Sequence, residues 1–227
     1  MSSVSIGVID YEVGNLHSVC KGLQKAGTRV EIVSKPYDLE RYDGLVLPGV
    51  GSFDPVVRSL RKHRFEKPIK AAIARQQPLL GICLGLQILF DGSTEGDEPG
   101  LGVFSGMVER FKPEPNLRIP HVGWNQLHFA QDIPLWMGLN NGCWMYFVHS
   151  YYVIPKDLKC VVATVTHGSQ IVTAAVARNN LMATQFHPEK SSEGGLQILE
   201  NFVHLIASSA KQTREFSGEL YLQSKSI

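Results

Sequence analysis

Residues 78–87 read Pro78-Leu79-Leu80-Gly81-Ile82-Cys83-Leu84-Gly85-Leu86-Gln87. An apolar run ends at a cysteine that has a glycine two residues away on each side, and a helical pattern follows as far as Phe90. This pattern is typical of a nucleophile elbow, a tight strand-to-helix turn that holds one side chain above a sheet. The glycines fit because such a turn brings the strand and helix backbones too close for a side chain. The stretch therefore predicts a strand, a sharp turn and a helix, with Cys83 as a candidate nucleophile.

Cys83 has two interpretations at this point. The N–H groups and the dipole at a helix N-terminus favour an anion, and the thiolate is the reactive form of cysteine. The alternative is an inert cysteine buried in a core strand, which is a common place for an unpaired cysteine. The elbow pattern by itself leaves both open.

A second motif, Thr184-Gln185-Phe186-His187-Pro188-Glu189-Lys190, closes another apolar run. Residues two apart in extended chain point to the same side, so His187 and Glu189 can lie together. A carboxylate beside an imidazole fixes its tautomer and stabilises its protonated form. A cysteine elbow combined with His-x-Glu at a strand end predicts nucleophilic catalysis, with His187 as the base and Glu189 as the group that orients it.

The first half of the chain alternates between strand and helix patterns. Strands are expected at Val4–Asp10, Arg29–Val33, Gly44–Leu47 and Pro78–Ile82, and helices at Asn15–Ala26, Phe53–Arg61 and Lys67–Gln76. This alternation predicts a parallel sheet with helices on both faces.

The second half is richer in strands. They are expected at Met107–Phe111, Gln126–Ala130, Cys143–Ile154, Cys160–His167, Ile171–Arg178 and Leu181–Phe186, with a last helix at Gly195–Ser208. We therefore expect one α/β domain over residues 1–210, mainly a parallel open sheet flanked by helices with an antiparallel portion in the second half. A loosely held polar tail is expected over residues 211–227.

Composition excludes several classes of protein. The net charge of +1 gives no overall field that would attract nucleic acid or an acidic membrane. The four cysteines are widely spaced, which argues against both a zinc cluster and a disulfide framework. No segment approaches the ~20 apolar residues of a membrane span, and no Gly-rich phosphate loop or metal-binding motif is present. We expect a cytoplasmic protein without cofactor or metal, since a reducing compartment preserves a reactive thiol.

The chain resembles a known family, the class I (triad) glutamine amidotransferases. The glutaminase motif of that family is similar to residues 81–87, followed downstream by His187-Pro188-Glu189. Further segments resemble the glutaminase subunits that serve histidine biosynthesis: residues 10–19, 47–53, Pro120-His121-Val122-Gly123-Trp124-Asn125, 147–152 and 187–191. One departure is Glu12, where the resemblance leads us to expect a glycine, and it leaves the local turn less certain.

The resemblance implies hydrolysis of L-glutamine to glutamate and ammonia through a cysteinyl thioester. Cys83 would attack the side-chain amide, His187 would transfer protons, and Glu189 would hold His187. It also implies an oxyanion hole made by the Leu84 N–H and by the loop Gly49-Val50-Gly51.

Further residues match positions that bind glutamine in the family: Gly49, Gln87, Glu95, Val148, Ser150 and Tyr151. Gln87 lies one helical turn after Cys83 on the same face, and its alternative role is a polar residue that caps or solvates the helix. Tyr151 has an alternative as a packed residue of an ordinary strand. The alternative for Glu95 is a solvated loop carboxylate.

Ammonia released into water at pH 7 is protonated and lost as a nucleophile, and the chain has no room for a second domain that would consume it. The acceptor must then be another polypeptide. The resemblance implies a (β/α)₈-barrel cyclase that forms a heterodimer with this chain, and Asn15, Trp124, Asn125 and Lys190 match positions at or near that interface. A large apolar and aromatic side chain such as that of Trp124 suits an interface anchor. The alternative role of Trp124 is packing in the core, and the alternative role of Lys190 is a solvated surface charge.

Three other functions remain. The chain could be the glutaminase of a different class I amidotransferase, or a different elbow-bearing cysteine enzyme such as a peptidase or deglycase. It could also be a binding subunit without activity. Peptidases and deglycases with such an elbow lack both a glutamine at the position of Gln87 and a His-Pro-Glu motif near the C-terminus. The presence of Cys83, His187 and Glu189 argues against an inactive subunit.

Overall fold

The computed structural model describes the backbone of residues 4–224 and the side chains of residues 4–209. An eight-stranded sheet runs through it in the order β2-β1-β3-β4-β13-β12-β11-β8. In chain order these strands are β1 (Ser5–Ile9), β2 (Arg29–Val33), β3 (Gly44–Gly49), β4 (Leu79–Cys83), β8 (His128–Phe129), β11 (Val161–His167), β12 (Gln170–Arg178) and β13 (Leu181–Thr184). The five strands from β2 to β13 are parallel, and β12, β11 and β8 continue the sheet antiparallel. The expected α/β architecture, including the antiparallel portion, is confirmed.

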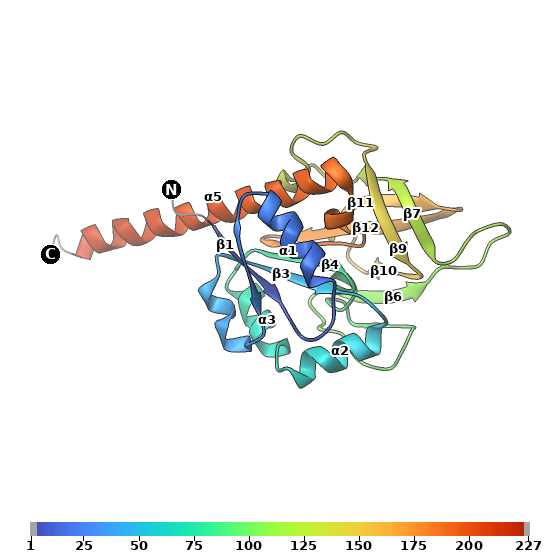
Figure 1. Cartoon of the computed structure of the whole chain (residues 1–227), viewed down its shortest axis with the longest axis horizontal. Coiled ribbons are helices and arrows are strands. Elements are labelled where there is room, and N and C mark those ends of the chain that lie inside the picture. Colours follow the sequence, from blue (N-terminus) through green and yellow to red (C-terminus); the bar gives the residue numbers. More distant parts are fainter. Residues whose placement is uncertain (1–3, 225–227) are drawn as a thin grey trace.

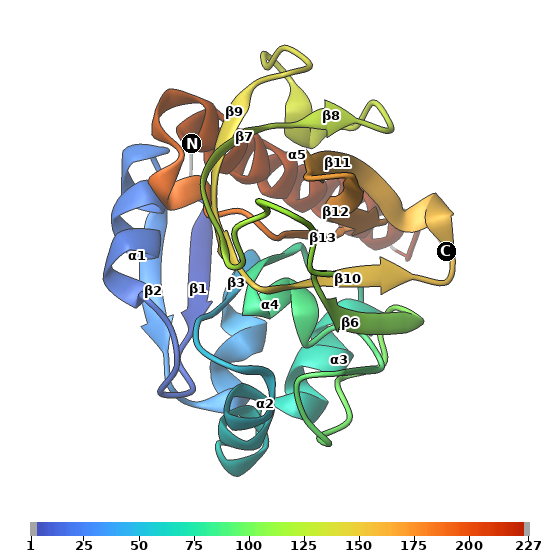
Figure 2. The same ribbon diagram turned by 90° about the vertical axis from the view of Figure 1, so that its right-hand side faces the viewer.

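The central strands are almost entirely apolar, with Thr184 at the end of β13 as the polar exception. Every residue of β3, β4 and β13 is buried, as expected for parallel strands covered on both faces. Helices α1 (Leu16–Lys25) and α5 (Ser192–Ser224) lie on one face, and α2 (Phe53–Lys62) and α3 (Glu66–Ala74) on the other (Figures 1 and 2).

Helix α5 is longer than the helix expected from the sequence, which ended at Ser208. Its backbone continues to Ser224 and extends beyond the body of the protein (Figure 1). The apolar periodicity that marks a helix in sequence is present only where α5 packs against the sheet, at Ile198, Phe202 and Ile206. Residues 211–224 are polar in sequence and lack clear apolar periodicity, so the pattern predicted no helix there.

Two small sheets accompany the large one. One contains β10 (Tyr151–Pro155), β6 (Gly106–Arg110) and β5 (Gly92–Ser93), and the other pairs β7 (His121–Gln126) with β9 (Trp144–His149). We call the β7–β9 pair the ribbon. It lies at the end of the molecule opposite the projecting part of α5 (Figure 1).

Two strand predictions in and around the ribbon were wrong. The single strand expected over Cys143–Ile154 is split at Ser150 into β9 and β10, which belong to different sheets. The strand expected over Gln126–Ala130 is reduced to the two residues of β8, and β7 precedes it unpredicted. The change of sheet partner leaves a run of strand-forming residues that is interrupted only by Ser150, so sequence pattern does not reveal it.

Four short 3₁₀ helices connect these elements: η1 (Pro36–Arg41), η2 (Pro134–Trp136), η3 (Leu158–Cys160) and η4 (Pro188–Lys190). A helix capable of crossing a membrane, by its length and apolar character, is not found within residues 4–224.

Candidate active site

The predicted elbow lies between β4 and the four-residue helix α4 (Leu84–Gln87). Cys83 occupies the turn with φ +56° and ψ −110°, a backbone conformation that non-glycine residues rarely adopt. The neighbouring glycines allow it, because a Cβ on Gly85 would lie 1.9 Å from the Leu47 carbonyl oxygen and one on Gly81 2.9 Å from the Gly85 oxygen. Such strain is characteristic of functional positions and persists only where the surrounding structure enforces it.

Three strand ends converge beside Cys83. Gly49, the last residue of β3, pairs with Cys83 across the parallel ladder, and Thr184, the last residue of β13, pairs with Ile82. The chain leaving β13 reaches His187 three residues later, and the chain leaving β3 forms the loop that contains Val50 and Gly51. Gly51 has φ +107°, in the region open to glycine. The carboxyl ends of parallel strands are where α/β sheets bind ligands.

His187 and Glu189 interact as the sequence predicts. His187 Nδ1 lies 2.8 Å from Glu189 Oε1, and the two side chains are only 3% and 1% exposed. Within the described residues, His187 Nε2 and Glu189 Oε2 have no hydrogen-bond partner.

Burial by itself would lower the pKa of His187. The neighbouring Cys83 sulfur and the Glu189 carboxylate outweigh it and raise the pKa to about 9. The sulfur and the ring are therefore close enough to interact, although Nε2 does not form a well-directed hydrogen bond. The protonated imidazole is the favoured form at neutral pH.

Gln185 is a residue of this site that our sequence reasoning did not single out. It is fully buried, and its Nε2 lies 3.8 Å from the Cys83 sulfur. Its Oε1 accepts a hydrogen bond from Gln87 Nε2 at 3.0 Å. A buried polar residue two positions before His187, and so on the same side of an extended chain, is the signal that could have identified it.

A cavity of about 250 Å³ opens beside the sulfur. Pockets for drug-sized ligands span about 300–1,000 Å³, so this cavity suits a smaller molecule. Eight predicted residues line it together with Pro120 and His149: Gly51, Cys83, Leu84, Gln87, Glu95, Val148, Ser150 and Tyr151. Figure 2 shows the parts of the chain involved, α4, β9 and β10, grouped at one end of the molecule. Gly49 and Val50 are adjacent in the chain to this lining.

Two predicted glutamine-binding residues also form bonds within the protein. Gln87 Nε2 donates to the Tyr151 carbonyl at 3.0 Å, so this buried side chain connects α4 to β10 rather than facing solvent. Glu95 Oε2 accepts from the Phe53 N–H at 2.8 Å, which caps the N-terminus of α2. Glu95 is therefore not a freely solvated loop carboxylate.

The four predicted interface residues lie in different environments. Trp124 is 48% exposed on the ribbon and does not pack in the core, and Lys190 is also exposed. Asn15 caps α1 by accepting from the Ser18 N–H. The Asn125 amide donates to the Thr166 carbonyl at 2.9 Å, so it holds the ribbon against β11.

Beneath the ribbon lie three histidines that sequence reasoning did not connect. His121 Nδ1 and His149 Nε2 are 3.0 Å apart, and the His121 ring stacks on His167 with centroids 4.2 Å apart. Burial, followed by the neighbouring histidine charges, lowers the pKa of His121 to about 4 and that of His149 to about 3. Both rings are therefore neutral near pH 7. These contacts join residues distant in sequence, and strand periodicity carries no signal for them.

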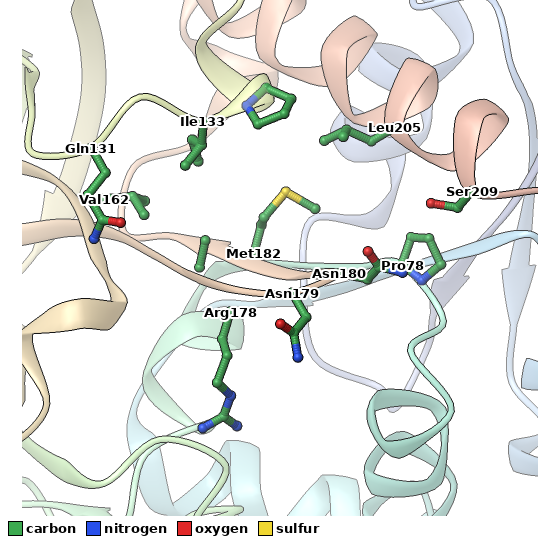
Figure 3. A pocket seen from close by; sticks show the side chains of 12 residues that line it. Pro78, Gln131, Ile133, Val162, Arg178, Asn179, Asn180, Met182, Leu205 and Ser209 are labelled. Atoms are coloured by element: carbon green, nitrogen blue, oxygen red, sulfur yellow. The ribbon is translucent and has the colours of Figure 1, made fainter. Parts of the chain in front are cut away.

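Another cavity, of about 270 Å³, lies away from the elbow, around Met182, Ile133 and Leu205 (Figure 3). None of Cys83, His187 and Glu189 lines it. Within the described residues, no group of three or more His, Cys, Asp or Glu side chains is arranged to hold a metal ion.

Comparison with known proteins agrees with this geometry. The model of the family described as glutamine amidotransferase class-I matches residues 7–206. A protein of Synechococcus sp. (strain JA-3-3Ab), named imidazole glycerol phosphate synthase subunit HisH, is 59% identical over 208 residues, which are 91% of this chain and 96% of that protein. The protein of the same name from Microcystis aeruginosa is 61% identical over 206 residues, 90% of this chain and 97% of the relative.

Solved structures share the fold at low sequence identity. The structure of PurLQS from Thermotoga maritima has a TM-score of 0.73 at 20% identity and covers 90% of this chain and 99% of that one. A structure titled glutamine amidotransferase has a TM-score of 0.68 at 22% identity and covers 89% of this chain and 98% of that one. The family match spans both the elbow and His187-Pro188-Glu189, and we conclude that this chain belongs to the class-I glutamine amidotransferases.

Proposed function

We propose that this chain is the glutaminase subunit of an imidazole glycerol phosphate synthase. It hydrolyses glutamine and passes the ammonia to a (β/α)₈-barrel cyclase in histidine biosynthesis. The observation that carries the proposal is the strained, buried Cys83 beside a His187–Glu189 pair, in a chain about 60% identical to relatives of that name over nine-tenths of its length.

The reaction begins at sulfur. The Cys83 thiolate attacks the side-chain amide carbon of glutamine and forms a tetrahedral oxyanion. Collapse of this intermediate breaks the C–N bond, and the protonated His187 gives its proton to the leaving nitrogen, so ammonia departs and a thioester remains. Glu189 holds the imidazole through Nδ1, which directs Nε2 to the reacting groups.

Water completes the cycle. His187, now neutral, takes a proton from a water molecule that attacks the thioester, and a second tetrahedral oxyanion forms. Its collapse releases glutamate and restores the thiolate. Leu84 is the first residue of α4, so its N–H has no acceptor within the helix and can bind both oxyanions. The second donor comes from the loop Gly49-Val50-Gly51.

The substrate lies in the cavity beside the sulfur. Its backbone end lies toward Val148, Ser150 and Tyr151, and Glu95 offers a carboxylate to the substrate ammonium. Support comes from the lining of the cavity, which gathers these side chains around Cys83. Gln87 donates hydrogen bonds to Gln185 and to the Tyr151 carbonyl, and these bonds hold this wall of the cavity in place.

The partner binds the outer face of the ribbon. Val122 pairs with Val148 and Trp124 with Tyr146 across the strands, so these side chains share one face. Val122, Trp124 and Val148 are exposed, and Val148 also lines the cavity. An apolar and aromatic patch at the mouth of a cavity suits a surface that receives another subunit. Asn15, Asn125 and Lys190 surround this face in the proposal.

The proposal also includes the domain boundaries and the cellular compartment. The family match ends at residue 206, which supports a glutaminase domain over residues 1–210 and an extension over 211–227. We assign the reaction to the cytoplasm, because all four cysteines are free thiols and a reducing compartment preserves them.

The decisive experiment compares Cys83→Ala with the unaltered chain, with glutamate and ammonia measured together and with a cyclase subunit present. The variant is expected to lose glutamine hydrolysis while still binding the cyclase, because the sulfur forms the covalent intermediate and is buried, whereas the ribbon face proposed to bind the partner is exposed. Unchanged ammonia release from Cys83→Ala would refute the thioester mechanism. Activity that is the same with and without the cyclase and its ligand would refute the coupling.

A further inference from the structure

Tyr11 is a fully buried residue just beyond the end of β1, and its side chain reaches the next strand of the sheet. Its hydroxyl donates a hydrogen bond of 2.5 Å to the Pro48 carbonyl. Pro48 is the penultimate residue of β3, directly before the loop Gly49-Val50-Gly51. The backbone of Tyr11 is held as well, since the Ser59 hydroxyl donates to its carbonyl. Tyr11 thus connects β1 and α2 to the start of this loop.

The hydroxyl also lies close to Gly49, the next residue of the chain. A Cβ placed on Gly49 would lie 3.0 Å from the Tyr11 hydroxyl, 2.7 Å from Leu84 Cβ and 2.9 Å from the Gly85 nitrogen. The phenol and the first residues of α4 therefore leave no room for a side chain on Gly49. The hydrogen bond to the Pro48 carbonyl adds to the pairing of β3 with β4 in fixing the orientation of the Pro48–Gly49 peptide.

The phenol is suited to act as a permanent donor. Burial first, and then the nearby charge of Cys83, raise the pKa of Tyr11 far above its ordinary value. The hydroxyl therefore keeps its proton at neutral pH and remains a donor. Tyr11 is not among the residues that line the cavity, so it does not touch the substrate there.

We propose that Tyr11 is a positioning residue for the oxyanion hole: its bond to the Pro48 carbonyl sets the peptide that leads into Gly49-Val50-Gly51, and so directs a backbone N–H of this loop at the oxyanion. The proposal rests on the glutaminase function described above. Tyr11 acts through the loop and contributes no atom to the reaction.

The test is Tyr11→Phe in the full chain with the cyclase present, because this change removes one oxygen and keeps the ring. Loss of a whole oxyanion donor typically costs ~10²–10³-fold in rate. A misdirected donor should cost part of that, so we expect kcat for glutamine hydrolysis to fall about 10-fold. KM for glutamine should stay within about 2-fold, because Tyr11 does not contact the substrate.

A second measurement separates positioning from general damage. Iodoacetamide alkylates the Cys83 sulfur by direct displacement of iodide, and no tetrahedral oxyanion forms in that step. The alkylation rate at Cys83, followed by mass spectrometry, should stay within about 2-fold in Tyr11→Phe. A kcat within 2-fold of the unaltered chain would overturn the proposal. A parallel fall of kcat and alkylation would also overturn it, since the phenol would then act on the sulfur or on the fold.

Two further variants complete the design. Tyr42→Phe removes a similar hydroxyl that donates to Glu31 at 2.9 Å on β2, away from the elbow, and should leave kcat unchanged. Ser59→Ala releases the Tyr11 backbone and should lower kcat by a smaller factor, again with unchanged alkylation. Should Tyr11→Phe not fold, an unchanged kcat in Ser59→Ala would overturn the proposal. If the unaltered chain releases no ammonia and matches Cys83→Ala, the glutaminase function itself fails.

Discussion

At the level of single residues, the proposed chemistry depends on one strained position. Cys83 combines φ +56° with almost complete burial, between two glycines that cannot be replaced without backbone collisions. The glycine spacing is visible in the sequence, and it correctly predicted the elbow. The bonds that complete the site were not visible. Gln185 lies near Cys83 and Tyr11 donates to Pro48 across the sheet, and each pair is distant along the chain. Such contacts depend on strand order, which a single sequence does not contain.

The raised pKa of His187 has a consequence for stability. The value in the fold, about 9, exceeds the ordinary 6.5, so the folded protein binds this proton more tightly than the unfolded chain does. The stabilisation is complete below pH 6.5 and is lost as the pH rises through about 9.

Urea unfolding of the unaltered chain and of His187→Gln, from pH 6 to pH 9.5, tests this expectation. The difference in free energy of unfolding should shrink across that interval, since both proteins share every other titrating group. A difference that stays constant with pH would contradict the raised pKa.

Glu12 offers a second prediction for a single residue. It has φ +65°, which explains why a glycine was expected at this position. Left-handed backbone costs a residue with a side chain about 1 kcal/mol. The contacts of Glu12 with Lys62 and His63, at 3.7 and 3.4 Å, are exposed and offset little of this cost.

Glu12→Gly should therefore raise the free energy of unfolding by about 0.5 kcal/mol. Thermal unfolding measures this directly. Gln76→Gly, at φ +60° and without charge, is the matched comparison and should gain at least as much. A loss of stability in both variants would show that the left-handed backbone at these positions is not strained.

At the level of helices and strands, the elbow depends on the contact of α4 with β3. Gly85→Ala would place a methyl group 1.9 Å from the Leu47 carbonyl oxygen, and neither backbone can move aside. We expect a loss of at least about 3 kcal/mol in the free energy of unfolding, together with loss of activity.

Gly92→Ala is the control for this substitution. A Cβ there meets its nearest atom, Met107 Cε, at 3.5 Å, an ordinary contact. Chemical denaturation should show a change of less than about 1 kcal/mol for Gly92→Ala. Equal losses in the two variants would show that the α4–β3 contact is not the cause.

Hydrophobic periodicity predicted the strands and helices of the parallel half well, because buried strands and amphipathic helices each leave a local pattern in the sequence. It failed in the ribbon region for a physical reason. Beyond Ser150 the chain leaves β9 and joins a different sheet as β10, while the run of strand-forming residues is interrupted only by Ser150 itself. The sequence records which side chains are buried, and it does not record which neighbour buries them.

At the level of the whole molecule, we propose that a second subunit binds the exposed face of the ribbon. Trp124→Ala should weaken association with the cyclase, because a large aromatic side chain near the centre of an interface typically contributes ~2 kcal/mol or more, which is at least about 30-fold in Kd. Titration calorimetry or analytical ultracentrifugation measures this.

Tyr37→Ala is the matched control for Trp124→Ala. Tyr37 is an aromatic residue that is 72% exposed on η1, which precedes β3 and is not part of the ribbon. It should leave Kd unchanged. Equal affinity of Trp124→Ala and the unaltered chain would remove Trp124 from the interface.

The order of the large sheet has one more consequence. An open sheet has two outer strands whose unpaired backbone groups can recruit further chains and start a fibril. Here one outer strand, β8, is only two residues long, and the other, β2, carries the charged side chains of Arg29 and Glu31. Free copies of this chain therefore have little exposed strand edge through which to pair with one another. At high concentration they should not form amyloid-like fibrils.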